Sequence, residues 1–170
     1  AVLHFSEHGA EIEEAYFTTT ALGHGVRARG GKLLSNFGYL NAQHHHYWDF
    51  ADMPLVYESF LGNHGINELG AQFQWTAPLP FYLMAGVEVL QGTNEGMFGN
   101  ETIGDAEDPI AKGASAPSLV VGYVKSSHDF GDTTVAGGIS YAQGSARIDH
   151  SGEEDPHAFS GDSKLYGADL

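Results

Sequence analysis

Apolar and polar residues alternate one by one along the stretch from Leu69 to Ala77. One side of the alternation carries Leu69, Ala71, Phe73, Trp75 and Ala77, and the other carries Gly70, Gln72, Gln74 and Thr76. A period of two is the period of a β-strand, because successive side chains of a strand point to opposite faces of the sheet. The stretch therefore predicts a strand with one apolar face and one polar face.

The same alternation recurs in other segments, which pair along the chain as hairpins. It returns between Phe81 and Val89 with Glu88 on the polar face, and the Pro-Leu-Pro sequence at 78–80 supplies a short turn. We expect two more hairpins and the start of a further strand, at 11–22 with 26–37, 119–126 with 133–142, and 164–170. The connections at one end of these hairpins are short. Those at the other end are long, at 38–68, 91–117 and 143–163.

This asymmetry is typical of outer-membrane β-barrels, which have short periplasmic turns and long extracellular loops. The expected strands are also close to the ~9–11 residues that a tilted strand needs to cross the hydrocarbon layer. We therefore expect one all-β unit over residues 1–170, made of antiparallel up-and-down hairpins of a transmembrane β-barrel. In that arrangement Gln72, Gln74, Thr76 and Glu88 face the lumen. A soluble sandwich or lipocalin-like barrel, with the apolar face inside, is the alternative.

The number of expected strands decides whether the chain could close a barrel by itself. Seven strand segments do not close a barrel, because single-chain bacterial barrels have an even number of strands, from about 8 upward. We expect the chain to be an incomplete segment of a larger barrel. Two alternatives remain, an eighth strand at 1–7 and a soluble protein.

Charge and composition narrow the function classes. Asp and Glu number 22 against 7 Lys and Arg, for a formal charge of −15, so nucleic acid is a poor candidate partner and we expect none. An acidic surface fits cations or the divalent-ion layer of an outer leaflet. The chain has no cysteine, which excludes disulfides and thiol chemistry. It carries no Gly-x-Ser-x-Gly, phosphate-loop or His-Glu-x-x-His motif, so we do not expect an enzyme.

Candidate metal ligands gather in and after the first long loop. They are His44, His46, Asp49, Asp52 and His64. Imidazole and carboxylate groups bind zinc and similar metals, and in an extended segment His44 and His46 would project to the same side. The other two long loops are acidic, and Asp149 to Asp155 offer the oxygen ligands that calcium takes. No cofactor is required, and zinc or calcium are the ions that these residues would accept.

Several segments resemble a family of proteobacterial outer-membrane barrel proteins, described as porin-like or as zinc-regulated TonB-dependent-receptor-like. The likeness covers about half of the chain and is carried by five segments, at 31–41, 43–57, 80–83, 88–90 and 165–170. It implies a location in the bacterial outer membrane and the passage or uptake of a small solute.

We therefore expect an outer-membrane channel or uptake protein for a small solute. Metal cations would be attracted by the acidic loops and contacted by the His-rich loop. Its partners would be outer-membrane lipid and the solute or metal ion, and an oligomer is compatible with this function. The alternative is a soluble or surface-attached β-protein that binds metal or self-assembles through its edge strands.

Overall fold

The computed structural model describes residues 1–6, 9–20, 22–49, 51–94, 96–105 and 107–170, without the side chains of residues 4–6, 10, 11 and 45. The elements in chain order are β1 (Val2–Ser6), β2 (Gly9–Thr18), β3 (Val26–Leu34), the 3-10 helix η1 (His45–Tyr47), α1 (Leu55–Leu61), β4 (Asn67–Thr76), β5 (Tyr82–Leu90), β6 (Ile103–Gly104), β7 (Pro109–Ala111), β8 (Leu119–Phe130), β9 (Thr133–His150) and β10 (His157–Asp169). The fold is therefore all-β, as the alternation predicts.

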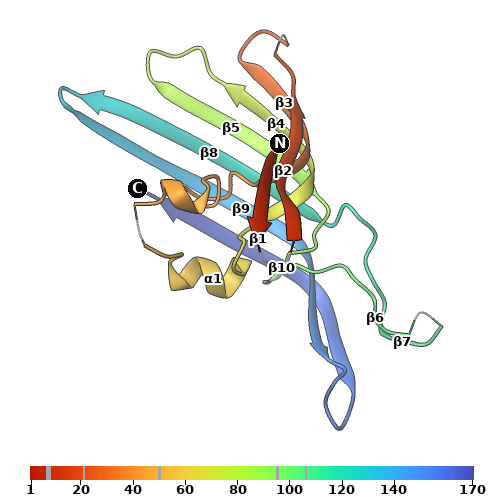
Figure 1. Ribbon diagram of the computed structural model, residues 1–170. Helices are drawn as coiled ribbons and strands as arrows, with labels where there is room; N and C mark the ends of the chain where they lie inside the picture. The colour runs from red at the N-terminus through yellow and green to blue at the C-terminus, as the bar shows by residue number, and fades with distance from the viewer. Residues whose placement is uncertain (7–8, 21, 50, 95, 106) are drawn as a thin grey trace.

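Eight of these strands form one antiparallel sheet in the order β1-β2-β3-β4-β5-β8-β9-β10, and β6 pairs with β7 in a separate hairpin. Neighbours in the large sheet follow one another along the chain, apart from the β6–β7 insertion, so the up-and-down topology is confirmed. The sheet is curled, and η1 and α1 lie on its concave side (Figure 1). It does not close on itself, because β1 and β10 form its two edges in the described chain.

The large sheet has eight strands instead of the expected seven because the N-terminal segment forms β1, and the third long loop lengthens two expected strands. β1 pairs with β2, as the alternative at 1–7 supposed, although Glu7 lies outside the described residues. The segment 143–163 is not a loop: β9 and β10 remain paired out to His150 opposite His157, which leaves only 151–156 as the turn. Along β9 the extension alternates Gly144, Ala146 and Ile148 with polar residues, but residues 158–163 of β10 show no such alternation.

The described parts of the first two long connections contain regular secondary structure. The segment between β3 and β4 runs from 35 to 66 and contains η1 and α1, so β4 begins at Asn67, inside the expected loop 38–68. The connection at 91–117 contains the β6–β7 hairpin. Among the described residues, no helix has the length and apolar character needed to cross a bilayer.

The two faces of the sheet have opposite environments. Large apolar side chains are exposed on the convex face, including Leu69, Phe73, Trp75, Val87 and Ile139. The concave face is buried and holds polar as well as apolar side chains, including Gln72, Gln74, Glu88, Tyr123 and Ser140. The sheet is therefore inverted relative to a soluble sandwich, in which the apolar side faces the interior.

Segment 35–66 covers the concave face. Its Phe37, Leu61 and Ile66 join a buried cluster with residues of β3, β5, β8 and β9, among them Leu33 and Leu90. A cavity of about 260 Å³ lies between α1 and β10, and its lining includes Phe37, Tyr57, Phe60, Leu165 and Asp169. The core of the molecule is thus the contact between this covering segment and the inner side of the sheet.

Candidate functional site

Strand register places two rows of residues across the concave face. One row runs Arg29, Gln72, Glu88, Val121, Ala142 and Leu165 from β3 to β10. The next runs Arg27, Gln74, Gly86, Tyr123, Ser140 and Gly167. Because cross-strand partners share a face, the polar residues of β3, β4 and β5 must lie next to one another. Both rows are therefore polar at β3 and β4; the first becomes apolar from β8 to β10, whereas the second keeps the polar Ser140 on β9.

The side chains of these rows bind one another. Gln72 Nε2 donates to Glu88 Oε1 at 2.7 Å, and Arg27 Nε donates to Gln74 Oε1 at 2.8 Å. Gln72 and Glu88 are fully buried. A buried carboxylate is costly unless several donors satisfy its lone pairs, so the surroundings of Glu88 decide whether it is tolerated.

The covering segment supplies the remaining donors to Glu88. Ser35 Oγ donates to Oε2, and the backbone N–H of Asn36 donates to Oε1 at 2.9 Å. Together with Gln72, they give the carboxylate three donors. Glu88 thus ties the start of the covering segment to the middle of β5.

Two further contacts carry the covering segment across the sheet toward β9. The backbone N–H of Gly38 donates to Ser140 Oγ at 2.9 Å, and Lys125 Nζ donates to the carbonyl of Gly38 at 2.7 Å. Behind these, Asn41 Nδ2 donates to the carbonyls of Ser35 and Ile66, and Asn41 Oδ1 accepts from the N–H of Ile66 at 2.7 Å. The segment is therefore fixed at both of its ends and held against β5, β8 and β9.

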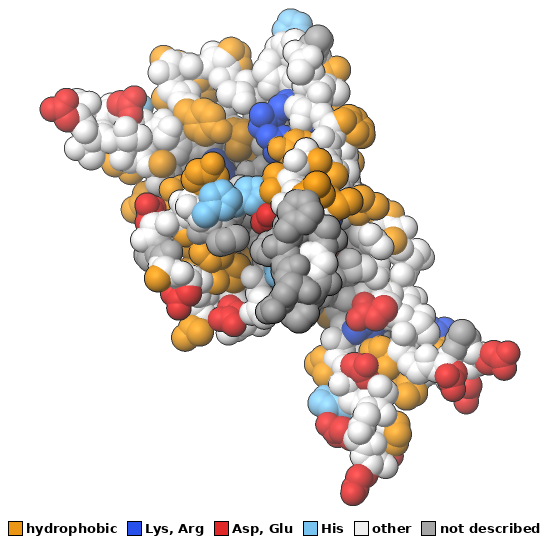
Figure 2. Space-filling view, viewed as in Figure 1, with side chains coloured by type: hydrophobic (Ala, Val, Ile, Leu, Met, Phe, Trp, Pro, Cys, Tyr) orange, Lys and Arg blue, Asp and Glu red, His pale blue; other side chains and the backbone are white. Residues whose placement is uncertain are grey.

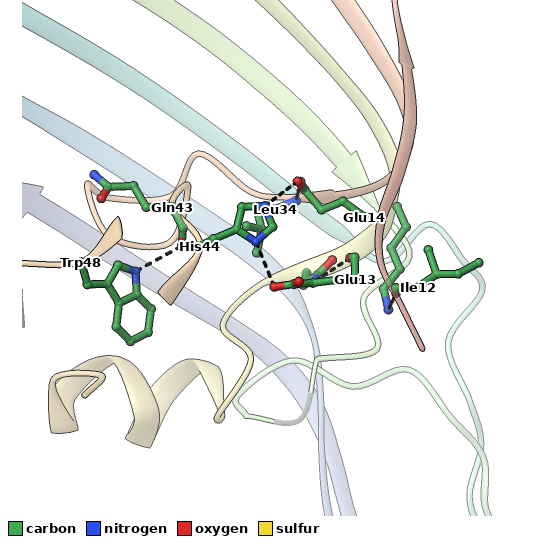
Figure 3. A network of polar contacts seen from close by, with 9 residues as sticks. Ile12, Glu13, Glu14, Leu34, Gln43, His44 and Trp48 are labelled. Atoms are coloured by element: carbon green, nitrogen blue, oxygen red, sulfur yellow. Dashed lines mark hydrogen bonds and ion pairs between the residues drawn. The ribbon is translucent and has the colours of Figure 1, made fainter. Parts of the chain in front are cut away.

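His44 makes a third attachment, to β2. Its Nδ1 lies 2.9 Å from Glu13 Oε1, and its Nε2 lies 3.0 Å from Glu14 Oε2 (Figure 3). Successive residues of a regular strand point to opposite faces, yet both carboxylates reach the same ring. A β-bulge explains this, because Val2 pairs with Glu14 while Leu3 pairs with Ile12, which leaves Glu13 as the extra residue.

The protonation of His44 follows from this geometry. Carboxylates only accept hydrogen bonds, so both contacts are satisfied together when the ring carries two N–H groups, that is, when it is the imidazolium. Burial by itself lowers the pKa of His44, but the hydrogen bonds and charges of Glu13 and Glu14 outweigh it, and the pKa is raised above its ordinary value of 6.5. In its protonated form, His44 is a charged link between the covering segment and β2.

The predicted metal ligands are only partly brought together. The rings of His44 and His46 stack with 5.5 Å between their centroids. Asp49, Asp52 and His64 are exposed in the same segment. Because both nitrogens of His44 face carboxylates, a metal would have to displace Glu13 or Glu14. The side chain of the intervening His45 is not among those that the structure describes. Metal binding by the five predicted ligands stays a prediction.

A different set of metal-type ligands lies at the far tip of the β9–β10 hairpin. Among the described residues, this is the place where three such groups, those of His150, Glu153 and His157, come within 4.8 Å of one another. Sequence reasoning treated this stretch as an acidic loop. The spacing of two histidines on either side of a short turn was the available signal, but it has meaning only once the two flanks are known to be paired strands.

Comparison with known proteins gives a relative but no function. An uncharacterized protein of Aquifex aeolicus (strain VF5) is 50% identical over 171 residues, which cover 100% of this chain and 36% of that protein. The chain thus spans about a third of the length of the curated relative it matches. No family model matches the sequence, and no solved structure matches it.

Proposed function

We propose that this chain is a segment of an outer-membrane β-barrel that passes a small solute, and that segment 35–66 narrows the passage. The observation that carries the proposal is that the sheet buries polar side chains on its concave face and exposes large apolar side chains on its convex face. Gln72 is 0% exposed, while Phe73, the next residue, is 53% exposed. Water is a poor solvent for a convex face of Leu, Phe, Trp and Val side chains, whereas lipid chains solvate it well. Lipid is therefore the surrounding that we propose for this face.

Strand length supports the same assignment. β3, β4 and β5 have 9, 10 and 9 residues, close to the ~9–11 residues of a tilted spanning strand. The short-turn end of the sheet carries exposed aromatic side chains, including Trp75, Phe81 and Tyr82 in and beside β4 and β5, and Phe130 at the end of β8. Aromatic residues of this kind gather where membrane meets water. This end corresponds to the periplasmic rim of the proposed barrel.

The open edges fit a segment of a larger barrel. A sheet in lipid must close, since unpaired N–H and C=O groups have no partner there. The matched Aquifex relative is longer than this chain. In the proposal, strands from the remainder of a protein of that length pair with β1 and β10 and complete the wall.

The concave face would then line the passage, with segment 35–66 folded into it. The polar rows of Arg27, Arg29, Gln72, Gln74 and Glu88 provide a wettable wall near β3 to β5. The formal charge of −15 favours cations at the mouth, including metal ions. The covering segment makes the passage narrow, because it is bound to Glu88, Ser140 and Glu14 rather than extending into solvent.

The two tryptophans give a direct test of the lipid-facing side. Trp75 is exposed on the convex face, whereas Trp48 lies in the covering segment and donates to the carbonyl of Gln43. The Trp48→Phe and Trp75→Phe variants leave one reporter each in protein refolded with vesicles of brominated phospholipid. We expect strong quenching of Trp75 and weak quenching of Trp48. Equal quenching, or a folded monomer in buffer without detergent, would contradict the proposal.

The edge strands also favour a second candidate, a β-protein that assembles through them. β10 has 13 residues and pairs on one side with β9. In this alternative the apolar convex face is covered by another copy in water. The chain would then form a defined oligomer in detergent-free buffer, and brominated lipid would quench neither tryptophan.

A further inference from the structure

The tip of the β9–β10 hairpin presents two histidines directly opposite each other. His150 and His157 are the last paired residues before the turn. Directly opposed residues of an antiparallel pair share a face, so their side chains must be neighbours. Their rings are stacked, with 4.8 Å between centroids and 14° between planes. The hairpin register thus fixes the relative position of two imidazoles.

The turn adds a carboxylate to this pair. The backbone N–H of Glu153 donates to the carbonyl of His150 at 3.2 Å, which folds the turn back on the strand. Glu153 Oε1 then lies 2.7 Å from His150 Nδ1. One potential ligand atom from each of His150, Glu153 and His157 lies within 4.8 Å of the others. All three positions are set by backbone structure.

The Nε2 atom of His157 is available to bind a metal. Its Nδ1 lies 2.8 Å from the carbonyl oxygen of Asp155. A carbonyl only accepts, so Nδ1 carries the proton, and in the neutral ring Nε2 has a free lone pair. Donation of one ring N–H to a carbonyl is the common arrangement of metal-bound histidines, because it fixes the tautomer and the orientation of the ring.

From this geometry we propose that His150, Glu153 and His157 form a binding site for a divalent transition metal, with zinc as the representative ion. Two imidazoles and one carboxylate are a zinc ligand set that leaves a position open for water or another ligand. Tetrahedral ligand atoms on zinc lie roughly 3.3 Å apart, given bonds of about 2.0–2.2 Å. Side-chain rotations of the exposed Glu153 and the half-buried His150 and His157 would bring the three ligand atoms, now within 4.8 Å of one another, to this spacing. The metal would take the place of the proton between His150 and Glu153, which is released to solvent.

The surroundings of the site favour a cation. Asp149, Glu154 and Asp155 lie within one or two residues of the three ligands. The hairpin tip projects away from the body of the molecule, and acidic side chains gather on that projection (Figures 1 and 2). Imidazole ligands select zinc-like metals over calcium, which takes oxygen ligands. This proposal does not depend on the channel, because the tip lies beyond the two inner rows of the sheet.

Zinc titration of the full folded chain by calorimetry tests the site, with the His150→Ala, His157→Ala double variant beside wild type. We expect the double variant to bind one zinc fewer per chain. The Glu153→Gln variant should keep the fold, because its side chain is exposed, and should weaken zinc binding by about tenfold or more, since one charged ligand is lost.

The matched control removes two exposed histidines that belong to neither candidate metal site, in a His24→Asn, His128→Ala variant. It should bind as many zinc ions as wild type. Calcium should not compete at comparable concentrations. The same zinc stoichiometry in wild type and the hairpin double variant, an unaltered affinity in Glu153→Gln, or displacement of zinc by equimolar calcium would each overturn the proposal.

Discussion

The side-chain amide of Gln72 on β4 donates to the carboxylate of Glu88, the residue directly opposite it on β5, at 2.7 Å. Both side chains are fully buried on the concave face. The same carboxylate accepts from Ser35 and Asn36 of the covering segment. The Glu88 carboxylate therefore accepts hydrogen bonds both from the sheet and from the covering segment, and it joins the two.

Removal of that acceptor should loosen the covering segment. In Glu88→Ala the donors of Ser35, Asn36 and Gln72 lose their partner, and each buried unsatisfied group costs about 1–3 kcal/mol. Because the Asn36 contact is only part-buried, we expect a loss near the lower end of that sum, so that the free energy of unfolding, measured by urea in detergent micelles, falls by about 3–4 kcal/mol. Limited proteolysis within 38–66 should also become faster.

Glu107→Ala is the matched control, since Glu107 is exposed in the β6–β7 connection. Its unfolding free energy should stay within about 0.5 kcal/mol of wild type. Equal stability of the two variants would show that Glu88 does not hold the segment.

The attachment of His44 to β2 should depend on pH. The pKa of His44 is raised above 6.5, so the folded state binds the proton more tightly than the unfolded state. The resulting stabilisation is fully present below about pH 6.5 and is lost as the pH rises through the raised pKa. We expect proteolysis of segment 35–54 to accelerate over that interval, and an NMR titration of His44 to give a pKa above 6.5.

His44→Gln should remove this pH dependence, whereas His64→Gln, which changes an exposed histidine of the same connection, should keep it. A measured pKa of His44 at or below its ordinary value would contradict the ion-pair arrangement with Glu13 and Glu14.

The strands and faces of the central hairpins could be predicted because one face is apolar. Phe73 and Gln72 already occupy opposite sides of the alternation in the sequence, and the structure places them on opposite faces. The extension of β9 and β10 could not be predicted in this way. Along β9, Gly144, Ala146 and Ile148 alternate with polar residues, but the signal is weak because Gly144 and Ala146 are small. Their partners on β10, Ser163, Gly161 and Phe159, form no apolar stripe.

The site contacts depend on pairings between residues far apart in the sequence. His44 and Glu13 are separated by 31 residues, and Ser35 and Glu88 by 53. The bulge at Glu13 that directs two successive carboxylates to one ring is set by strand pairing, which no local pattern records. The sequence indicated His44 as a candidate metal ligand. It could not show that carboxylates of β2 would contact both of its ring nitrogens.

Close packing of β2 against β3 leaves no room for a side chain at Gly31. Its φ is 134°, a region that side chains rarely adopt, and a Cβ there would lie 2.7 Å from the Cα of Tyr16. We expect Gly31→Ala to lower the free energy of unfolding by about 1–3 kcal/mol, from backbone strain and the clash. Gly161→Ala on β10 is the control, because a Cβ there meets nothing within 4 Å. Similar stabilities of both variants would show that β2 moves away freely.

The strongest discrimination between lipid and water on the convex face comes from a matched pair of lysine substitutions. Phe73 and Ile148 are 53% and 55% exposed, but Phe73 lies on the convex face of the central hairpin, whereas Ile148 lies in the β9–β10 extension, on the opposite side of the sheet. In the proposed barrel, Phe73→Lys places a charge against lipid and should cost about 2–4 kcal/mol of folding free energy in bilayers. Ile148→Lys lies beyond the membrane and should cost less than about 0.5 kcal/mol. In water, both positions would tolerate lysine equally. Equal costs of Phe73→Lys and Ile148→Lys in folding titrations with phospholipid vesicles would therefore contradict the membrane assignment.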